Sequence, residues 1–301
     1  MTTDSPVSTT IRTNGKAPAS AYPKVRRMKF RFGEPEPIKR HFVEGDIALS
    51  HLMAILSGTF PPGEESFIRS VRRFSDQITD PVLKKRVAAF VGQEAVHGQQ
   101  HRELNEKLIE KGYLMVRFLN FGPNTLRQKL FVFGEKLLPA KVHLALTAAA
   151  EHYTATLGLR VLETPEIQAI PADPEAWHLL NWHAFEELEH KSVAFDVYRA
   201  VGGPEWIRIA VMRILYYFTI PVATAAVAVS VLTDPSGWRP IKLLRQAYGI
   251  FRGPILGGLM AEIRPYMRRG FHPDDIDTDA VLQKWQKELF GTEGILVDRA
   301  K

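Results

Sequence analysis

The chain of 301 residues contains no cysteine. This absence excludes disulfides, thiolate metal ligands and a cysteine nucleophile, and it suits a reducing compartment. Residues 1–22, rich in Ser, Thr, Pro and Ala, lack the apolar run of a secretory signal, so we expect a cytoplasmic protein. Nucleic-acid-binding motifs are also missing, and a net charge of +6 does not by itself make nucleic acid an expected partner.

One long stretch lacks charge altogether. Residues 214–232 are nineteen uncharged residues, interrupted only by Pro221. Their length nearly meets the requirement for a bilayer span, but a helix packed over the protein or a hairpin in one leaflet would have the same composition. Contact with the inner face of a membrane and packing on the protein therefore both stay open. Residues 235–269 indicate one or two further basic amphipathic helices, and residues 272–275 open a last short one.

The residues with the clearest chemistry lie at 181–191. His183, Glu187 and His190 are spaced by four and three residues, which places them on one face of a helix. Apolar residues extend that face in both directions, so it is expected to be buried: Leu180, Ala194 and Val197. Buried imidazoles and carboxylates cost several kcal/mol without partners, and a metal ion would satisfy them.

A second cluster has the same spacing. Glu94 and His97 repeat the Glu-x-x-His pattern of Glu187 and His190, and each pattern follows a single glutamate, Glu64 or Glu151, by a helical-hairpin length. Two such helices plus one inward Glu from each of two others are typical of ferritin-like carboxylate proteins. The sequence therefore predicts an all-α fold, a ferritin-like four-helix bundle with additional C-terminal helices. Glu64 is preferred to Glu65 because Glu64 shares a face with apolar residues.

The helix boundaries follow from prolines and glycines. We predict a short helix over 46–56, ending before Pro61 and Pro62, and bundle helices from about Gly63, over 81–111, over Ala140–Glu163 and over 175–201. Residues 113–138 are expected to form an aromatic connection. The domain division is a disordered tail and basic arm over 1–40, the metal-binding bundle over 41–206, and apolar and basic helices over 207–301 that pack on the bundle or lie at a membrane.

The remaining polar residues near these patterns are ambiguous. His183 is expected to be a third nitrogen ligand or a partner of one, and His101 an additional ligand or a residue behind the ligands. Residue 98 is Gly98, where a zinc-protease helix needs Glu. Small residues beside Glu151 indicate either a pocket or close helix packing. Other polar residues we expect to be solvated or behind the ligands, namely His152, Glu186 and Glu189, or structural, namely His41, His51, His143 and His178.

At these residues the chain resembles a family of bacterial proteins described as predicted metal-dependent hydrolases, a ferritin-like group. The resemblance runs from about His41 to Pro273 and rests on four motifs: residues 60–64, residues 93–97 with His101, residues 151–152 and residues 187–190. The ligand order is also similar to that of the di-iron arylamine N-oxygenases, whose pattern is Glu, Glu-x-x-His, Glu, His-x-x-x-Glu-x-x-His. That likeness implies a metal-ligand set, matched here by Glu64, Glu94, His97, Glu151, His183, Glu187 and His190.

These observations predict a di-iron oxidoreductase that activates dioxygen to oxidise a small-molecule or lipid substrate, with an unidentified electron donor. Sulfur-free carboxylate and imidazole ligands suit two iron ions, with manganese, mixed manganese/iron or zinc as alternatives. A hydrolase that uses a metal-activated water is the alternative function. A non-catalytic metal-binding or storage protein is the third. A homodimer and a membrane surface stay open as partners.

Overall fold

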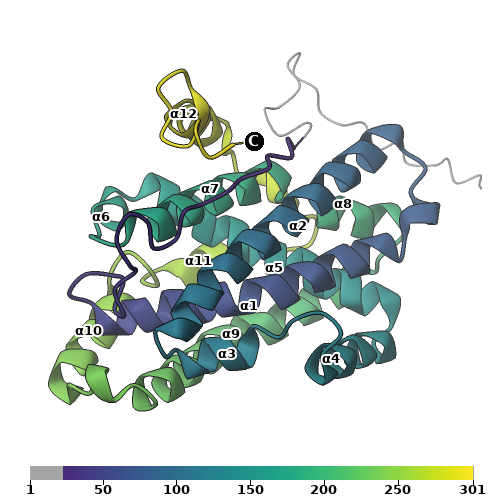
Figure 1. Cartoon of the computed structure of the whole chain (residues 1–301). Coiled ribbons are helices and arrows are strands. Elements are labelled where there is room, and N and C mark those ends of the chain that lie inside the picture. The colour runs from purple at the N-terminus through teal and green to yellow at the C-terminus, as the bar shows by residue number, and fades with distance from the viewer. Residues whose placement is uncertain (1–22, 301) are drawn as a thin grey trace, which may run out of the picture.

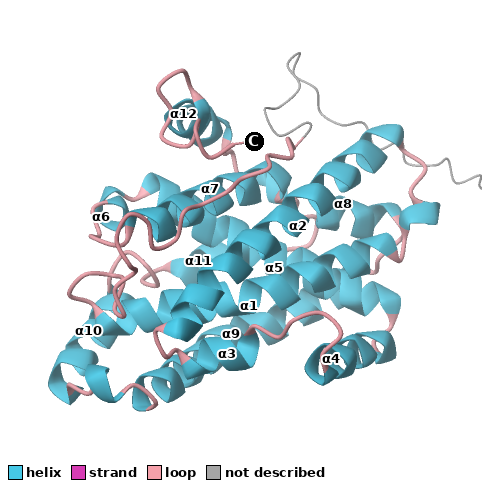
Figure 2. Cartoon of the chain, viewed as in Figure 1, coloured by secondary structure: helices cyan, strands magenta, loops and turns pink. Residues whose placement is uncertain are grey.

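The structure is a computed structural model that describes residues 23–300. Over that range the chain consists of helices and loops, and its β structure is confined to two isolated bridges, Met28 with Ala300 and Val43 with Ala172 (Figure 2). The prediction of an all-α fold is confirmed. The predicted disordered tail, residues 1–22, lies outside the described residues.

Four long helices surround one interior (Figure 1). They are α1 (Ile47–Arg72), α2 (Pro81–Glu110), α5 (Ala140–Glu163) and α7 (Pro174–His190). Helix α1 packs on α2 and α5, and α7 packs on α5 and α2, so the four helices close a square. Asp80 caps α2 and Pro81 occupies its first turn, as the sequence predicts. The ferritin-like assignment of this arrangement stays a prediction.

The predicted break before the first bundle helix is wrong. Helix α1 runs without interruption through Pro61 and Pro62. A proline inside a helix removes one N–H and leaves the carbonyl four residues earlier unpaired. Here the amide of Asn105 on α2 donates to the carbonyl of Ser57 at 2.9 Å. The hydrogen bond that Pro61 cannot make is therefore replaced by one from a neighbouring helix.

The predicted fourth helix is also corrected, because it is two helices. Helix α7 ends at His190, and α8 (Val193–Ala200) follows after Lys191 and Ser192. Both intervening residues are buried and bonded to residues distant in sequence. Lys191 donates to the hydroxyl of Thr278 at 3.0 Å, and Arg86 donates to the hydroxyl of Ser192 at 2.7 Å. The helix is interrupted where these tertiary contacts are made, and local helix propensity therefore does not predict the interruption.

The connection 113–138 is largely helical, against our prediction. It contains α3 (Leu114–Leu119) and α4 (Leu126–Leu137), and α6 (Pro165–Gln168) lies in the loop before α7. Thr125 caps α4 by accepting from the Gln128 N–H. Helix α3 packs on α1, where the glycine at position 58 leaves room for Leu119.

The C-terminal region adds α9 (Glu205–Leu232), α10 (Pro240–Arg252), α11 (Leu259–Ile263) and α12 (Asp279–Phe290). Helix α9 packs lengthwise on α5 and α1, α10 packs on α1, and α12 packs on α7 and α5. The prediction of one or two helices over 235–269 is confirmed. The last helix begins at Asp279 rather than at His272, because residues 273–275 form only one 3₁₀ turn. Further 3₁₀ turns cover Ser75–Gln77, Pro235–Gly237 and Arg264–Met267.

Residues 23–40 form an extended arm that lies against α7 (Figure 1). The ring of Phe30 packs on Trp182 of α7, with 5.6 Å between the ring centroids, and Arg26 is buried against two glutamates of the same helix. The arm is therefore joined to the bundle through its side chains. The three-part domain division stays a prediction.

Candidate metal centre

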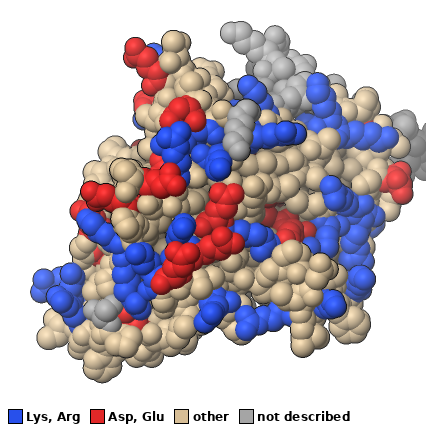
Figure 3. Space-filling model, viewed as in Figure 1, with Lys and Arg blue, Asp and Glu red and all other residues tan. Residues whose placement is uncertain are grey.

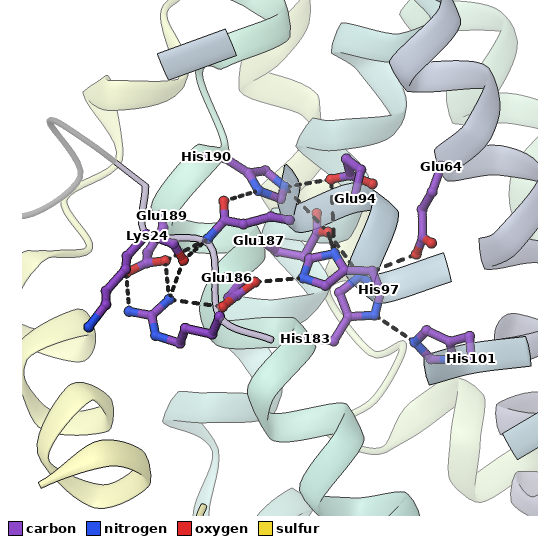
Figure 4. Close-up of polar contacts among 12 residues, drawn as sticks. Lys24, Glu64, Glu94, His97, His101, His183, Glu186, Glu187, Glu189 and His190 are labelled. Atoms are coloured by element: carbon purple, nitrogen blue, oxygen red, sulfur yellow. Dashed lines mark hydrogen bonds and ion pairs between the residues drawn. The ribbon is translucent and has the colours of Figure 1, made fainter. Parts of the chain in front are cut away.

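Eight buried His and Glu side chains meet in the interior between the four long helices. Figure 4 labels all of them except Glu151. They form four overlapping groups whose ligand atoms lie within 4.8 Å of one another, and Glu151 joins them through His190. All seven predicted ligands are brought together, with His101 beside them. Helix α1 contributes Glu64, α2 contributes Glu94, His97 and His101, α5 contributes Glu151, and α7 contributes His183, Glu187 and His190.

At one end of the cluster three carboxylates converge on one nitrogen. The Nε2 atom of His190 lies 3.1 Å from Glu94 Oε1, 3.2 Å from Glu151 Oε2 and 3.4 Å from Glu187 Oε1. Ligand atoms held about 2.1 Å from a metal ion are separated from one another by roughly 3 Å. These spacings therefore match those of donors around a shared cation.

At the other end His183 lies beside His97 and Glu64. Its Nε2 atom is 2.9 Å from Glu187 Oε1 and 3.7 Å from Glu64 Oε1. The Nδ1 atom of His97 is 3.8 Å from Glu187 Oε1 and 4.0 Å from Glu94 Oε1. The sequence grouped His183 with His190, whereas the structure places it nearer to His97 and Glu64. Glu94 and Glu187 lie within reach of both ends.

Eight of the carboxylate oxygens and imidazole nitrogens in the cluster have no hydrogen bond. Within residues 23–300, both carboxylate oxygens of Glu64, Glu94 and Glu151 are buried without a hydrogen-bonding partner, as are Nδ1 of His97 and Nε2 of His190. Each buried unpaired polar group costs about 1–3 kcal/mol, and more if it is charged. Because eight such atoms face one interior, the donor set fits metal ions in number and in kind.

Two carboxyl groups and two imidazoles of the cluster have pKa values that favour their neutral forms. Burial raises the pKa of Glu64 and of Glu151 well above the ordinary value, and the neighbouring carboxylates raise both further. Burial and the nearby imidazole of His183 lower the pKa of His97 and of His101. These histidines are therefore neutral and able to ligate. Bound cations would replace the protons that the crowded carboxyl groups otherwise retain.

The far nitrogens of two histidines are held by other side chains. Nε2 of His97 lies 3.1 Å from Glu186 Oε2, and Nδ1 of His190 lies 3.0 Å from the amide oxygen of Gln93. Arg26 in turn bonds Glu186 at 2.9 Å and Glu189 at 2.7 Å. These contacts orient the remaining nitrogen of each ring toward the carboxylates, as partners behind metal-bound histidines do.

Sequence reasoning missed Arg26 and the role of Gln93, although Gln93 belongs to the motif at residues 93–97. Gln93 immediately precedes Glu94 on α2, and this position is a signal that was available. Arg26 comes from the extended arm, and no periodicity connects it to α7. We predicted that Glu186 and Glu189 would be either solvated or behind the ligands. Both are buried behind the ligands, so the prediction of solvation is wrong.

His101 lies behind His183 in a chain of hydrogen bonds. Its Nε2 atom is 2.7 Å from Nδ1 of His183, and its Nδ1 atom is 2.9 Å from the hydroxyl of Ser57. Ser57 donates to Asn105 at 2.7 Å. Every member of the chain is satisfied if His183 donates to His101 and His101 donates to Ser57. This leaves Nε2 of His183 facing Glu187.

The structure also places the neighbouring residues whose roles were ambiguous. Glu65 points away from the cluster and pairs with Arg102, whereas Glu64 is buried. A Cβ atom at Gly158 would lie 2.9 Å from the carbonyl of Ala184, so this small residue serves close packing of α5 on α7. His152 is buried against Tyr266.

A separate group of possible ligands lies outside the bundle interior. His41 and His51 contact the same oxygen of Asp234, at 2.9 and 3.2 Å. Arg40 already supplies a positive charge to that carboxylate at 2.9 Å. His51 also bonds the hydroxyl of Ser230 at 2.8 Å. These contacts agree with the structural role predicted for both histidines.

The comparisons with known proteins agree with one of the two resemblances. No curated protein and no solved structure matches the chain. A family described as predicted metal-dependent hydrolase matches residues 24–277, which covers the whole cluster and begins in the arm that carries Arg26. The likeness to the di-iron N-oxygenases stays a prediction. Because the match spans most of the chain, this protein belongs to the family of predicted metal-dependent hydrolases.

Proposed function

We propose that the cluster binds two metal ions and that the protein is a metal-dependent enzyme. The observation that carries the proposal is the convergence of unpaired carboxylate and imidazole atoms in a buried interior. Glu64 and His97 would hold one ion, and Glu151 and His190 the other. Glu94 and Glu187, which lie within reach of both ends, would supply donors to either ion. His183 would complete the first group.

Hydrolysis is the reaction that the family description supports. A metal ion would lower the pKa of a bound water and polarise the bond to be cleaved. The side chains of this protein would hold the metal-binding atoms in position. Gln93 bonds the ring of His190 and Glu186 bonds the ring of His97, so both rings keep their orientation. Thr154 donates to Glu187 and so limits the rotation of that carboxylate.

The donor set supports a second candidate, oxidation of an organic substrate with dioxygen. Carboxylates and imidazoles without sulfur suit iron or manganese, which would supply the redox chemistry. No cluster residue is more than 4% exposed. Phe60 packs on the rings of His101 and His183, with centroids 4.7 and 4.6 Å apart, and helps to exclude water. This candidate requires an external electron donor.

The test begins with metal analysis of protein purified without added metal. Near two ions per chain is the expected result, and Glu94→Ala and His190→Ala should reduce that number while leaving helicity intact. Wild-type metal content in both variants would refute the centre. Glu65→Ala serves as the matched control, since Glu65 lies next to a proposed ligand but faces Arg102.

Hydrolysis and oxidation can be distinguished by the metal that each requires and by whether oxygen is consumed. Anaerobic ferrous protein mixed with oxygenated buffer should consume oxygen if the second candidate is correct, and His183→Ala should alter the visible spectrum more than it lowers iron content. Ester or amide cleavage supported by redox-inert zinc, together with no oxygen consumption, would establish hydrolysis instead.

A further inference from the structure

One side of the molecule exposes large apolar side chains from four neighbouring helices. We call the exposed surface of α3, α4, α9 and α10 the apolar face. Helix α3 packs on α9, and Arg127 of α4 bonds the carbonyl of Phe118 in α3 at 2.9 Å, so the surface is continuous. The side chains on it that are more than half exposed include Phe118, Phe133, Phe218, Ile241 and Leu244, and Trp238 adds to them from the turn before α10. Large apolar side chains that are exposed side by side mark an interaction site.

The charges around this face have one sign. Between residues 206 and 261 the only acidic residue is Asp234, and between 114 and 137 it is Glu135; both are buried and paired with arginines. The exposed charges are basic: Arg117, Lys129, Arg213, Arg239, Lys242 and Arg245. In Figure 3 the lower edge of the molecule, where α10, α9, α3 and α4 lie in Figure 1, is mostly tan and blue.

A groove of about 520 Å³ opens on the apolar face. Its walls come from α1, α5, α9 and α10 and are almost entirely apolar. Leu232, Trp238 and Leu244 line it and are at the same time 65%, 63% and 72% exposed, so they form its mouth. Deeper in, Leu56 and Leu157 form its wall. An apolar groove with an apolar mouth suits a hydrocarbon chain.

We propose that the apolar face rests in one leaflet of an anionic membrane and that the groove receives an acyl chain of a lipid. Basic residues around an apolar surface are the pattern of proteins that lie in the interface, and each Lys or Arg near an anionic surface adds about 1 kcal/mol of attraction. Helix α9 is long and apolar enough to cross a bilayer, yet one side of it is packed along α5 and α1. It therefore lies in the membrane plane and does not span.

A second copy of the chain fits this face less well than a membrane does. A symmetric contact between two such faces would bring their basic residues together, because the exposed charges on both are positive. Anionic headgroups neutralise those charges. The charge pattern therefore selects the bilayer over self-association.

Two residues that line the groove lie one helical turn from residues that contact the candidate metal centre. Leu56 lies one helical turn before Phe60, whose ring contacts His101 and His183. Leu157 lies close in sequence to Thr154, which bonds Glu187. A long-chain lipid is therefore the substrate class that we assign to the proposed function. This assignment depends on that function, whereas membrane and chain binding do not.

Vesicle flotation of the full-length, metal-loaded protein tests the membrane contact. The protein should float with phosphatidylglycerol–phosphatidylcholine vesicles, less so at high salt, and weakly with phosphatidylcholine alone. Tyr248 is exposed on α10, as Ile241, Lys242 and Arg245 are. Ile241→Ser/Tyr248→Ser and Lys242→Glu/Arg245→Glu should each abolish flotation. Val82→Ser/Lys84→Glu makes the same kinds of change at the start of α2 and should float like wild type. Failure of the wild type to float, or a native dimer that the α10 variants dissociate, would overturn the proposal.

Binding of cis-parinaric acid, a fluorescent polyene fatty acid, tests the groove. Ala223 lines the groove and Ala225, on the same helix, does not. Ala223→Phe should weaken binding by about tenfold, or roughly 1.4 kcal/mol, whereas Ala225→Phe should not. Equal affinity in both variants would refute the chain site. Metal content is measured in the same samples, so an empty metal centre with intact fatty-acid binding would refute only the proposed function.

Discussion

Helices α7 and α9 reverse the usual relation between polarity and burial. Thirteen of the seventeen residues of α7 are buried, and they include four glutamates and two histidines. Helix α9 has 28 residues and a long uncharged run, yet only Arg208, Val211, Met212 and Ser230 are buried. Interiors normally exclude charge, and apolar helices normally enter them. Arginines of the chain itself neutralise three of the four glutamates of α7. The rest of the reversal is explained if each helix has a partner outside the polypeptide, a pair of metal ions for Glu187 and the two histidines of α7 and a lipid layer for α9.

The largest effect is expected when the metal ions of α7 are removed. A ligand at about 1,000 times its Kd stabilises a fold by about 4 kcal/mol, so chelation should lower the Tm of the wild type markedly. Glu151→Gln should lose at least half of the metal but, once chelated, should be more stable than the chelated wild type, because it removes one of several crowded carboxyl groups. Metal analysis with thermal unfolding measures both effects. Glu65→Gln is the control, and a chelator that leaves the wild-type Tm unchanged would contradict the partner assigned to α7.

The next effect concerns the arm that neutralises α7. Arg26→Ala would leave the buried carboxylates of Glu186 and Glu189 without a counter-charge, which costs about 3–5 kcal/mol. Urea unfolding of the metal-loaded protein measures the loss. Arg27 is exposed, so Arg27→Ala should change stability by less than about 0.5 kcal/mol. Equal values for the two variants would show that the arm does not stabilise the bundle.

On α9 the two sides of the helix should respond differently. Met212→Ala should cost about 2–5 kcal/mol, because Met212 is fully buried. Phe218→Ser, on the exposed side, should stay within about 0.5 kcal/mol in detergent-free buffer. Chemical unfolding of both variants makes the comparison. A large loss for Phe218→Ser would show that this side is covered by protein and would weaken the membrane proposal.

The smallest effect concerns the attachment of α4 to α1. Burial alone would raise the pKa of Glu135, but its hydrogen bonds with Arg69, at 2.7 and 2.8 Å, outweigh burial and lower it. Because the pKa of Glu135 is lower in the folded state, its ionised carboxylate stabilises the fold at pH values above the ordinary pKa of 4.5. This stabilisation is lost as the pH falls through the folded-state pKa. The protection factors of the α4 amides, which are exchange rates corrected for the intrinsic effect of pH, should therefore fall below about pH 4.5. Glu135→Gln should remove this fall. Wild-type protection factors that stay constant across this range would contradict the role of this pair.

Local sequence determined the all-α class, the bounds of α2 and α5, and the meeting of the ligand residues. Apolar periodicity, a capping Asp80 before Pro81, and the repeated Glu-x-x-His spacing act within one helix and are readable without neighbours. Tertiary structure decided what depends on contacts distant in sequence. Asn105 lets α1 continue through Pro61, Thr278 and Arg86 hold the break after His190, and Arg26 enters from the arm to neutralise α7. The uncharged run of α9 was readable as apolar, but whether protein or solvent would lie against it was decided only by how α1 and α5 pack.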